Sequence, residues 1–217
     1  MNNCHGVVPG SAYSSFHTAQ GVPIVDLTRF PGGLASMAAR AQQHPPMTFS
    51  WYTNNCADSP TACAENWPAN VSHIHYEGDV NATLRWGMSG VKVDGCGAFN
   101  NMTLYGELYN QSGKAVLIES CHGTSGCTPD PATGGFRPDG TPGTNTSSSS
   151  WGICPYFKPD GELVCPFHYF RVSADVSFSF DSMMGNLQEM IKFVNVSRPG
   201  CWAHPDSELH SAQQRCI

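Results

Sequence analysis

Apolar and polar positions along the chain predict helices and strands in alternation. Helix-forming runs, or apolar residues that recur every three to four positions, predict helices over residues 33–43, 77–87, 100–110 and 181–194. Short runs of β-branched and aromatic residues predict strands over residues 47–55, 91–94, 115–118, 169–176 and 200–203. Strands that alternate with helices across short connections are typical of a parallel sheet.

The predicted helix over 181–194 has the clearest pattern in the chain. We expect Asp181 to cap its N-terminus, because a side-chain oxygen at that position accepts hydrogen bonds from free backbone N–H groups. One face of this helix carries an apolar stripe that we expect to lie in the core, formed by Met183, Met184, Leu187, Met190, Ile191 and Val194.

Residues 123–150 are rich in Gly, Pro, Ser and Thr and are too polar for a core segment. Four cysteines flank this tract, namely Cys121, Cys127, Cys154 and Cys165. We therefore expect one domain over residues 1–217, with a long disulfide-flanked surface loop at about 123–165.

Two parallel architectures fit the alternation, a (β/α)8 barrel and a doubly wound sheet. No Gly-x-Gly-x-x-Gly or Gly-x-x-x-x-Gly-Lys-Ser/Thr loop follows a predicted strand, which disfavours nucleotide-binding folds. We therefore expect the α/β class and a (β/α)8 TIM barrel.

Composition excludes several classes of partner. The formal net charge is −6 and no basic block occurs, so nucleic acid is a poor partner. No segment approaches the roughly 20 uninterrupted apolar residues that a membrane span requires.

The cysteines and glycosylation sequons indicate the secretory pathway. The chain has 10 cysteines and no Cys-x-x-Cys pair, which favours disulfides over a zinc site. Asn-x-Ser/Thr sequons occur at Asn70, Asn81, Asn101, Asn110, Asn145 and Asn195. We expect a secreted protein or one of the lysosomal or vacuolar lumen. Residues 1–5 lack the basic and apolar regions of a signal peptide, so we expect a fragment or a start further upstream.

Two acids stand where a parallel barrel places its catalytic groups. Asp94 closes the predicted strand VKVD, and Asp175 lies near the end of RVSAD. Two carboxylates that face a common cleft are the minimum for glycoside hydrolysis. Lys92 and Arg171, on the same strands, are suited to bind hydroxyls and to hold one acid ionised. By pattern alone, each acid is equally well explained as the cap of the next helix.

Seven blocks along the chain resemble the family 27 glycoside hydrolases, the melibiase-type α-galactosidases and α-N-acetylgalactosaminidases. They occur in the family's order and cover nearly the whole chain, at residues 26–33 (DLTRFPGG), 79–87 (DVNATLRWG), 91–96 (VKVDGC), 110–114 (NQSGK), 171–175 (RVSAD), 181–182 (DS) and 199–206 (PGCWAHPD).

The resemblance implies a role for each matching residue. Asp94 matches the family's nucleophile and Asp175 its acid/base. The positions that match contacts to the sugar, or that lie near them, are Lys92, Arg171, Tyr52, Trp51, His122 and Asp206. Cys56 and Cys96 match cysteines that form a disulfide in the family.

The implied reaction is a retaining double displacement that releases terminal α-D-galactosyl residues and needs no metal or organic cofactor. The partner would be an α-galactoside-containing oligosaccharide or glycoconjugate, and a homodimer is compatible with the resemblance. Galactose and N-acetylgalactosamine both remain open as the sugar. By the resemblance, the chain runs from the family's second barrel strand to its seventh, so strand 1, strand 8 and the C-terminal β-sandwich would lie outside it.

Two alternatives remain. One is an inactive or fragmentary paralogue that binds carbohydrate without cleaving it. The other is a metal-dependent hydrolase that uses His73 and His75 with Glu77 or Asp79, because alternate residues of a strand share a face. That segment leads straight into a predicted helix, which argues against the metal site. His122 and His168 are further candidates for hydrogen bonds to a sugar.

Overall fold

The computed structural model describes most of the chain, with gaps, over residues 17–18, 20–53, 72–94, 101–121, 129–130, 135–136, 155–158 and 160–206. The chain divides into two compact units, Met1–Ile118 and Glu119–Ile217. Several residues named in the sequence analysis lie outside the described residues, namely Cys56, Cys96, His122, Cys127, Cys154, Asn70 and Asn145.

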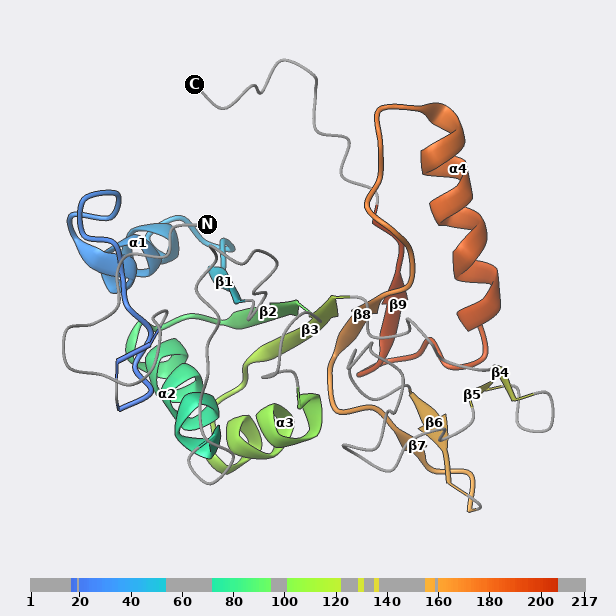
Figure 1. Ribbon diagram of the computed structural model, residues 1–217, viewed down its shortest axis with the longest axis horizontal. Helices are drawn as coiled ribbons and strands as arrows, with labels where there is room; N and C mark the ends of the chain where they lie inside the picture. The colour runs from blue at the N-terminus through green and yellow to red at the C-terminus, as the bar shows by residue number, and fades with distance from the viewer. Residues whose placement is uncertain are drawn as a thin grey trace. The chain divides into compact units, whose positions relative to one another are not determined.

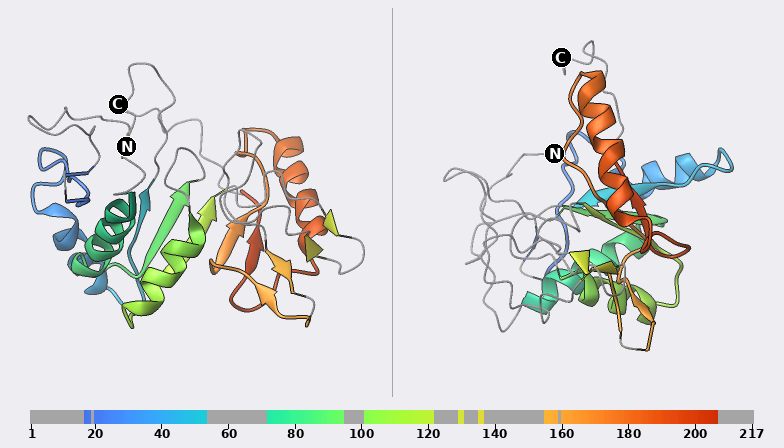
Figure 2. Two further views of the ribbon diagram at one scale, coloured as in Figure 1. Left: turned by 60° about the horizontal axis from the view of Figure 1, so that its bottom comes forward. Right: turned by 90° about the vertical axis from the view of Figure 1, so that its right-hand side faces the viewer.

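The first unit pairs two parallel strands, β1 (Ser50–Thr53) and β2 (Gly90–Asp94). The N–H of Leu117, which opens β3 (Leu117–Cys121), donates to the carbonyl of Ser89, just before β2. Three helices accompany these strands, α1 (Gly33–Gln42), α2 (Ser72–Arg85) and α3 (Met102–Gln111). Figure 2 (left) shows α2 and α3 over one face of β1 and β2.

Burial in the first unit follows from strand alternation. Val91 and Val93 are at most 2% exposed, whereas Lys92 between them is only half-buried. Aromatic and aliphatic side chains of α2 and α3 complete the interior: Tyr76, Val80, Ala82, Met102, Tyr105 and Tyr109. The helices therefore cover the apolar face of the sheet.

The second unit contains three strands in parallel, in the order β3, β8 (Tyr169–Arg171) and β9 (Trp202–His204). The boundary between the units falls within β3. Helix α4 (Phe180–Glu189) continues into the 3-10 helix η2 (Met190–Phe193), and both lie between β8 and β9 in the chain (Figure 1). Phe170 of β8 is fully buried, and its ring lies 6.0 Å from that of Phe193.

The segment expected to form a long loop contributes four short strands. They are β4 (Pro129–Asp130), β5 (Gly135–Phe136), β6 (Tyr156–Phe157) and β7 (Leu163–Val164), which form a separate sheet. A disulfide joins Cys165, directly after β7, to Cys201, directly before β9. Cys165 is thus bonded to a cysteine distant from the loop rather than to another flanking cysteine.

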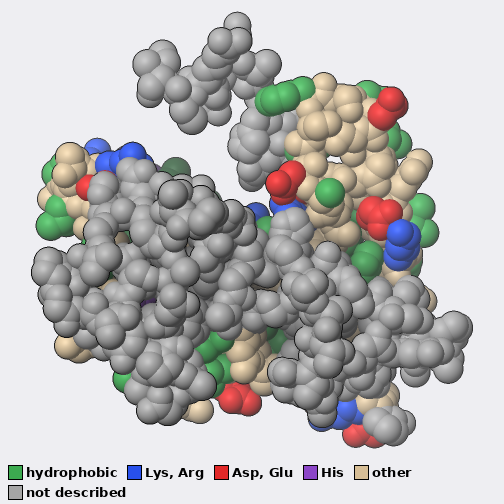
Figure 3. Space-filling model, in the orientation of Figure 1, with side chains coloured by type: hydrophobic (Ala, Val, Ile, Leu, Met, Phe, Trp, Pro, Cys, Tyr) green, Lys and Arg blue, Asp and Glu red, His purple; other side chains and the backbone are tan. Residues whose placement is uncertain are grey.

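The predicted core face of the last helix is only partly buried, since Met183, Met184 and Met190 are half-buried. Among the residues of the apolar stripe, Leu187, Ile191 and Val194 are 43%, 70% and 63% exposed. Figure 3 shows hydrophobic side chains at the surface in the part of the molecule where Figure 1 draws α4. A regular stripe shows that a helix is amphipathic, but it does not show that a neighbouring element covers it.

The capping prediction is also wrong. Ser179, not Asp181, caps α4, and its hydroxyl accepts a hydrogen bond of 3.0 Å from the N–H of Ser182. The helix begins earlier than predicted, so Asp181 lies in its first turn, where a negative charge still favours the positive end of the helix dipole.

Parallel strands with intervening helices agree with the predicted α/β class. The (β/α)8 barrel remains a prediction. None of the described helices is long and apolar enough to cross a lipid bilayer.

Candidate functional site

In both units the sheet has a polar face opposite its helices. Trp51 donates a hydrogen bond of 2.8 Å to Thr83 of α2, so Trp51 lies on the helix side of β1. Tyr52, next along the strand, faces the other way and pairs in register with Lys92. Tyr52 and Lys92 therefore lie on the face of the sheet opposite the helices. Of the two predicted aromatic residues, Trp51 and Tyr52, only Tyr52 lies there.

The second unit repeats this arrangement. The Phe170 ring packs against Phe193 of η2, so its neighbour Arg171 points to the opposite face of β8. There Arg171 pairs in register with His204. Glu119 lies on the same face, and its carboxylate is 3.4 Å from Nε2 of His204. Glu119 and His204 received no role in the sequence analysis, although their alternation with buried Ile118 and Ala203 marks them as belonging to this face.

Asp175 is anchored by a buried cation. Nη1 of Arg171 donates to Oδ1 of Asp175 at 2.6 Å and lies 3.4 Å from Oδ2 of Asp206. Arg171 is 5% exposed, whereas the side chain of Asp175 is 82% exposed. A buried guanidinium thus fixes one oxygen of a carboxylate that remains open to solvent.

The strand predicted to contain Asp175 is shorter than expected and ends before it. β8 ends at Arg171, so Asp175 stands in the loop that follows the carboxyl end of the strand. This is still the end at which parallel barrels place their catalytic groups.

Asp206 supports this loop from the end of β9. Its Oδ2 accepts from the N–H of Val176 at 3.0 Å, and its own N–H donates to Oγ of Ser173 at 2.8 Å. Asn186 of α4 donates to the carbonyls of Ala174 and Asp206 at 3.0 and 2.8 Å. Asp206 therefore positions the loop of Asp175, and Asn186 is a contributor that sequence reasoning missed because an Asn within a helix gives no local signal.

Asp94 is the last residue of β2, at the carboxyl end that the sequence predicted. Its side chain is not among those described. The two predicted catalytic acids belong to different units, Asp94 to the first and Asp175 to the second.

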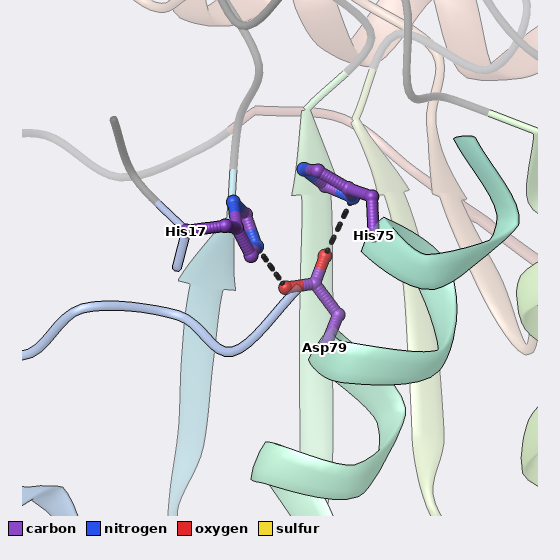
Figure 4. Close-up of side chains that lie close together, drawn as sticks. All are labelled: His17, His75 and Asp79. Carbon is purple, nitrogen blue, oxygen red and sulfur yellow. Dashed lines mark hydrogen bonds and ion pairs between the residues drawn. The ribbon is translucent and has the colours of Figure 1, made fainter. Parts of the chain in front are cut away.

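A second polar cluster lies buried within the first unit (Figure 4). Nε2 of His17 donates to Oδ1 of Asp79 at 2.7 Å, and Nδ1 of His75 is 3.6 Å from Oδ2 of Asp79. Their side chains are 3%, 0% and 0% exposed. These three residues offer ligand atoms within 4.8 Å of one another, a spacing that suits a metal ion.

The strand geometry assumed for the metal-site alternative is wrong. His73, His75, Glu77 and Asp79 all lie on helix α2 rather than on a strand. His73 and Glu77 are exposed, whereas His75 and Asp79 are spaced four residues apart and share the buried face. The third member, His17, is 62 residues from Asp79 and was not identified from the sequence.

Buried tyrosines surround this cluster and remain hydrogen-bond donors. The Tyr105 hydroxyl donates to Oδ2 of Asp79. Burial, and after it the Asp79 carboxylate, raise the pKa of Tyr105 well above its usual value. Burial also raises the pKa of Tyr76 to about 12 and increases that of Tyr109. All three phenols are therefore protonated at neutral pH.

Comparison with protein families, with curated proteins and with solved structures finds no match to this chain.

Proposed function

We propose that this protein is a retaining glycoside hydrolase that removes terminal α-galactosyl residues. The observation that carries the proposal is the Asp175 site. A carboxylate stands in the loop after the carboxyl end of a parallel strand, is 82% exposed, and is held by a buried arginine that also contacts Asp206. The sequence resemblance assigns the acid/base role to the same residue.

The polar face of the sheet supports a carbohydrate as the substrate. Sugars present many hydroxyls, which charged and phenolic side chains bind. In the first unit, Tyr52 and Lys92 lie on the polar face of its strands, and in the second unit, Glu119, Arg171 and His204 lie on the polar face of its own strands. Tyr52 is 42% exposed, so its ring is available to contact a sugar.

The proposed reaction has two steps. First, the Asp94 carboxylate attacks the anomeric carbon while Asp175 donates its proton to the leaving oxygen, so the glycosidic C–O bond breaks. Second, Asp175 takes a proton from water, whose oxygen displaces Asp94 and releases the sugar with its original anomeric configuration. This chemistry requires the two carboxyl groups to be about 5–5.5 Å apart.

A secreted or lumenal location is part of the proposal. The Cys165–Cys201 disulfide is stable only in an oxidising compartment. Four of the sequon asparagines lie within the described residues, and all of them are exposed and accessible to a glycan: Asn81, Asn101, Asn110 and Asn195.

The test is hydrolysis of nitrophenyl α-galactoside and nitrophenyl α-N-acetylgalactosaminide by the chain expressed through the secretory pathway. We expect hydrolysis of one of the two substrates, and proton NMR should show that the sugar is first released as the α-anomer. Asp94→Asn and Asp175→Asn should each lower kcat/KM by at least about 100-fold. Asp181→Asn is the matched control, because this exposed acid lies only six residues after Asp175.

Three results would decide against the proposal. Release of the β-anomer would exclude a retaining mechanism. Unchanged activity in either catalytic variant would remove that acid from the reaction. A folded, glycosylated wild-type chain that binds galactose without cleaving either substrate would favour the carbohydrate-binding alternative.

A further inference from the structure

The buried His17–His75–Asp79 cluster depends on a close approach of two backbones. His17 and Thr18 begin a tight turn, in which the N–H of Thr18 donates to the carbonyl of Val22 at 2.9 Å. The turn lies against helix α2 at two glycines. A Cβ on Gly78 would be 1.7 Å from the carbonyl oxygen of Gly21, and a Cβ on Gly21 would be 2.1 Å from that of Ile74. Only glycine at both positions lets the turn bring His17 to Asp79.

The distances in the cluster suit metal ligands. The 2.7 Å contact between His17 and Asp79 is a hydrogen bond, but the 3.6 Å from Nδ1 of His75 to Oδ2 of Asp79 is too long for one. Two ligands of a tetrahedral ion with bonds of about 2.0–2.1 Å lie roughly 3.3 Å apart. The His75 distance is close to that value, and the His17 distance needs to lengthen by about half an ångström.

The surroundings of Asp79 resemble the second shell of a metal site. Ligating carboxylates are commonly held by a further hydrogen bond, and Tyr105 donates to Oδ2 of Asp79 from the neighbouring helix α3. Either oxygen of Asp79 can still bind the ion, because a carboxylate oxygen that accepts one hydrogen bond keeps a second lone pair. The ligand atoms of His17, His75 and Asp79 all lie within 4.8 Å of one another, so small side-chain rotations bring all three to one ion.

We propose that His17, His75 and Asp79 bind a divalent transition-metal ion, with Zn²⁺ as the best fit to two imidazoles and one carboxylate. The ion replaces the proton that His17 directs at Asp79, and that proton passes to solvent. Because all three side chains are at most 3% exposed, no glycoside can reach the ion. The site is structural, it fastens the turn at His17 to helix α2, and it is independent of the proposed hydrolase activity.

The experiment measures zinc per chain after dialysis of the secreted protein against a chelator and reloading with Zn²⁺. We expect about one equivalent in the wild type, and at least about 100-fold weaker binding in His17→Gln and His75→Asn, which retain hydrogen-bonding side chains. His73→Gln is the matched control, because this exposed histidine lies on the same helix two residues before His75. It should bind as tightly as the wild type.

Two wild-type readouts decide the question even if a variant fails to fold. Added Zn²⁺ should raise the Tm, as any ligand of the native state does. Co²⁺ in place of zinc should give the visible bands of a tetrahedral nitrogen and oxygen site without thiolate charge-transfer absorption. A folded wild type that binds no stoichiometric zinc, a thiolate spectrum, or full binding by His17→Gln and His75→Asn would each overturn the proposal.

Discussion

The two units place their acids in opposite environments. In the first unit, Asp79 is 0% exposed and lies on the buried face of helix α2 among histidines and tyrosines. In the second unit, the side chain of Asp175 is 82% exposed, and only its anchor, Arg171, is buried. An acid enclosed on every side stabilises the fold or holds an ion, whereas an anchored acid with a free oxygen can act on a substrate.

The same contrast applies to the apolar side chains. Helices α2 and α3 bury their aromatic residues against the sheet, and Tyr105 is fully buried. Helix α4 and η2 leave Leu187 and Ile191 exposed. The first unit thus buries both polar and apolar side chains in one interior. The second unit fixes the loop of Asp175 and leaves one face of α4 and η2 exposed. Four predictions test or refine this difference.

The largest effect should come from the buried acid. Asp79→Ala leaves the polar groups of His17 and Tyr105 buried without their partner, so we expect the free energy of unfolding to fall by about 3–5 kcal/mol. Asp175→Ala should cost less, because the Asp175 side chain is 82% exposed and the buried Arg171 keeps its contact with Asp206. Urea denaturation of both variants measures the difference, and equal costs would mean that burial does not distinguish the two acids.

The buried tyrosines should make stability sensitive to alkaline pH. The pKa of Tyr76 is about 12 in the folded chain against its ordinary value of 10.0. The unfolded chain therefore loses this proton first, and stability falls as the pH rises from about 10 to about 12. A shift of this size corresponds to roughly 3 kcal/mol.

Urea denaturation at pH 7 and pH 11 checks this prediction. Tyr76→Phe should show a smaller alkaline loss than the wild type, and its stability at pH 7 is the internal control. If wild type and variant lose the same amount between the two pH values, Tyr76 makes no contribution to the alkaline loss.

A smaller effect is expected from the residue that joins the loop of Asp175 to β9. Asn186→Ala removes two hydrogen bonds that a buried side chain donates to backbone carbonyls, and it should cost about 2 kcal/mol. Gln188→Ala, an exposed change on the same helix, should stay within about 0.5 kcal/mol. Thermal unfolding of the three proteins provides the comparison, and an equally mild effect of both changes would show that Asn186 does not hold the loop.

The smallest effect should be at the exposed helix face. Ile191 is 70% exposed, so Ile191→Ala should change the free energy of unfolding by no more than about 0.5 kcal/mol. Phe193, two residues later, is 5% exposed, and Phe193→Ala should cost at least about 3 kcal/mol. A cost at Ile191 that approaches the cost at Phe193 would mean that this face is covered in solution.

Local sequence patterns predicted several individual helices and strands well. The helix predicted over 33–43 is α1, the strand over 91–94 is β2, and the helix over 100–110 is α3. The helix predicted over 77–87 begins five residues earlier, at Ser72, because its first turns carry the residues that face His17 and not a regular apolar stripe.

Pairing and burial were harder to predict. The sequence offered no reason to bond Cys165 to Cys201 rather than to a nearer cysteine, since 10 cysteines allow many pairings. The apolar stripe on α4 and η2 was predicted to be buried from its periodicity. Periodicity shows only that one helix face is apolar. Whether another element reaches that face depends on packing.

Periodicity over a few residues was enough to predict the order of helices α1–α4 and of strands β1, β2, β3, β8 and β9, but not the short strands β4–β7. It also put Asp94 at the end of its strand and Asp175 close after another. The exposure of Asp175, the burial of Asp79 and the contact of His17 with Asp79, 62 residues away, follow from packing between distant segments. These outcomes depend on which backbones approach each other, here at Gly21 and Gly78, and contacts of that kind have no local signature.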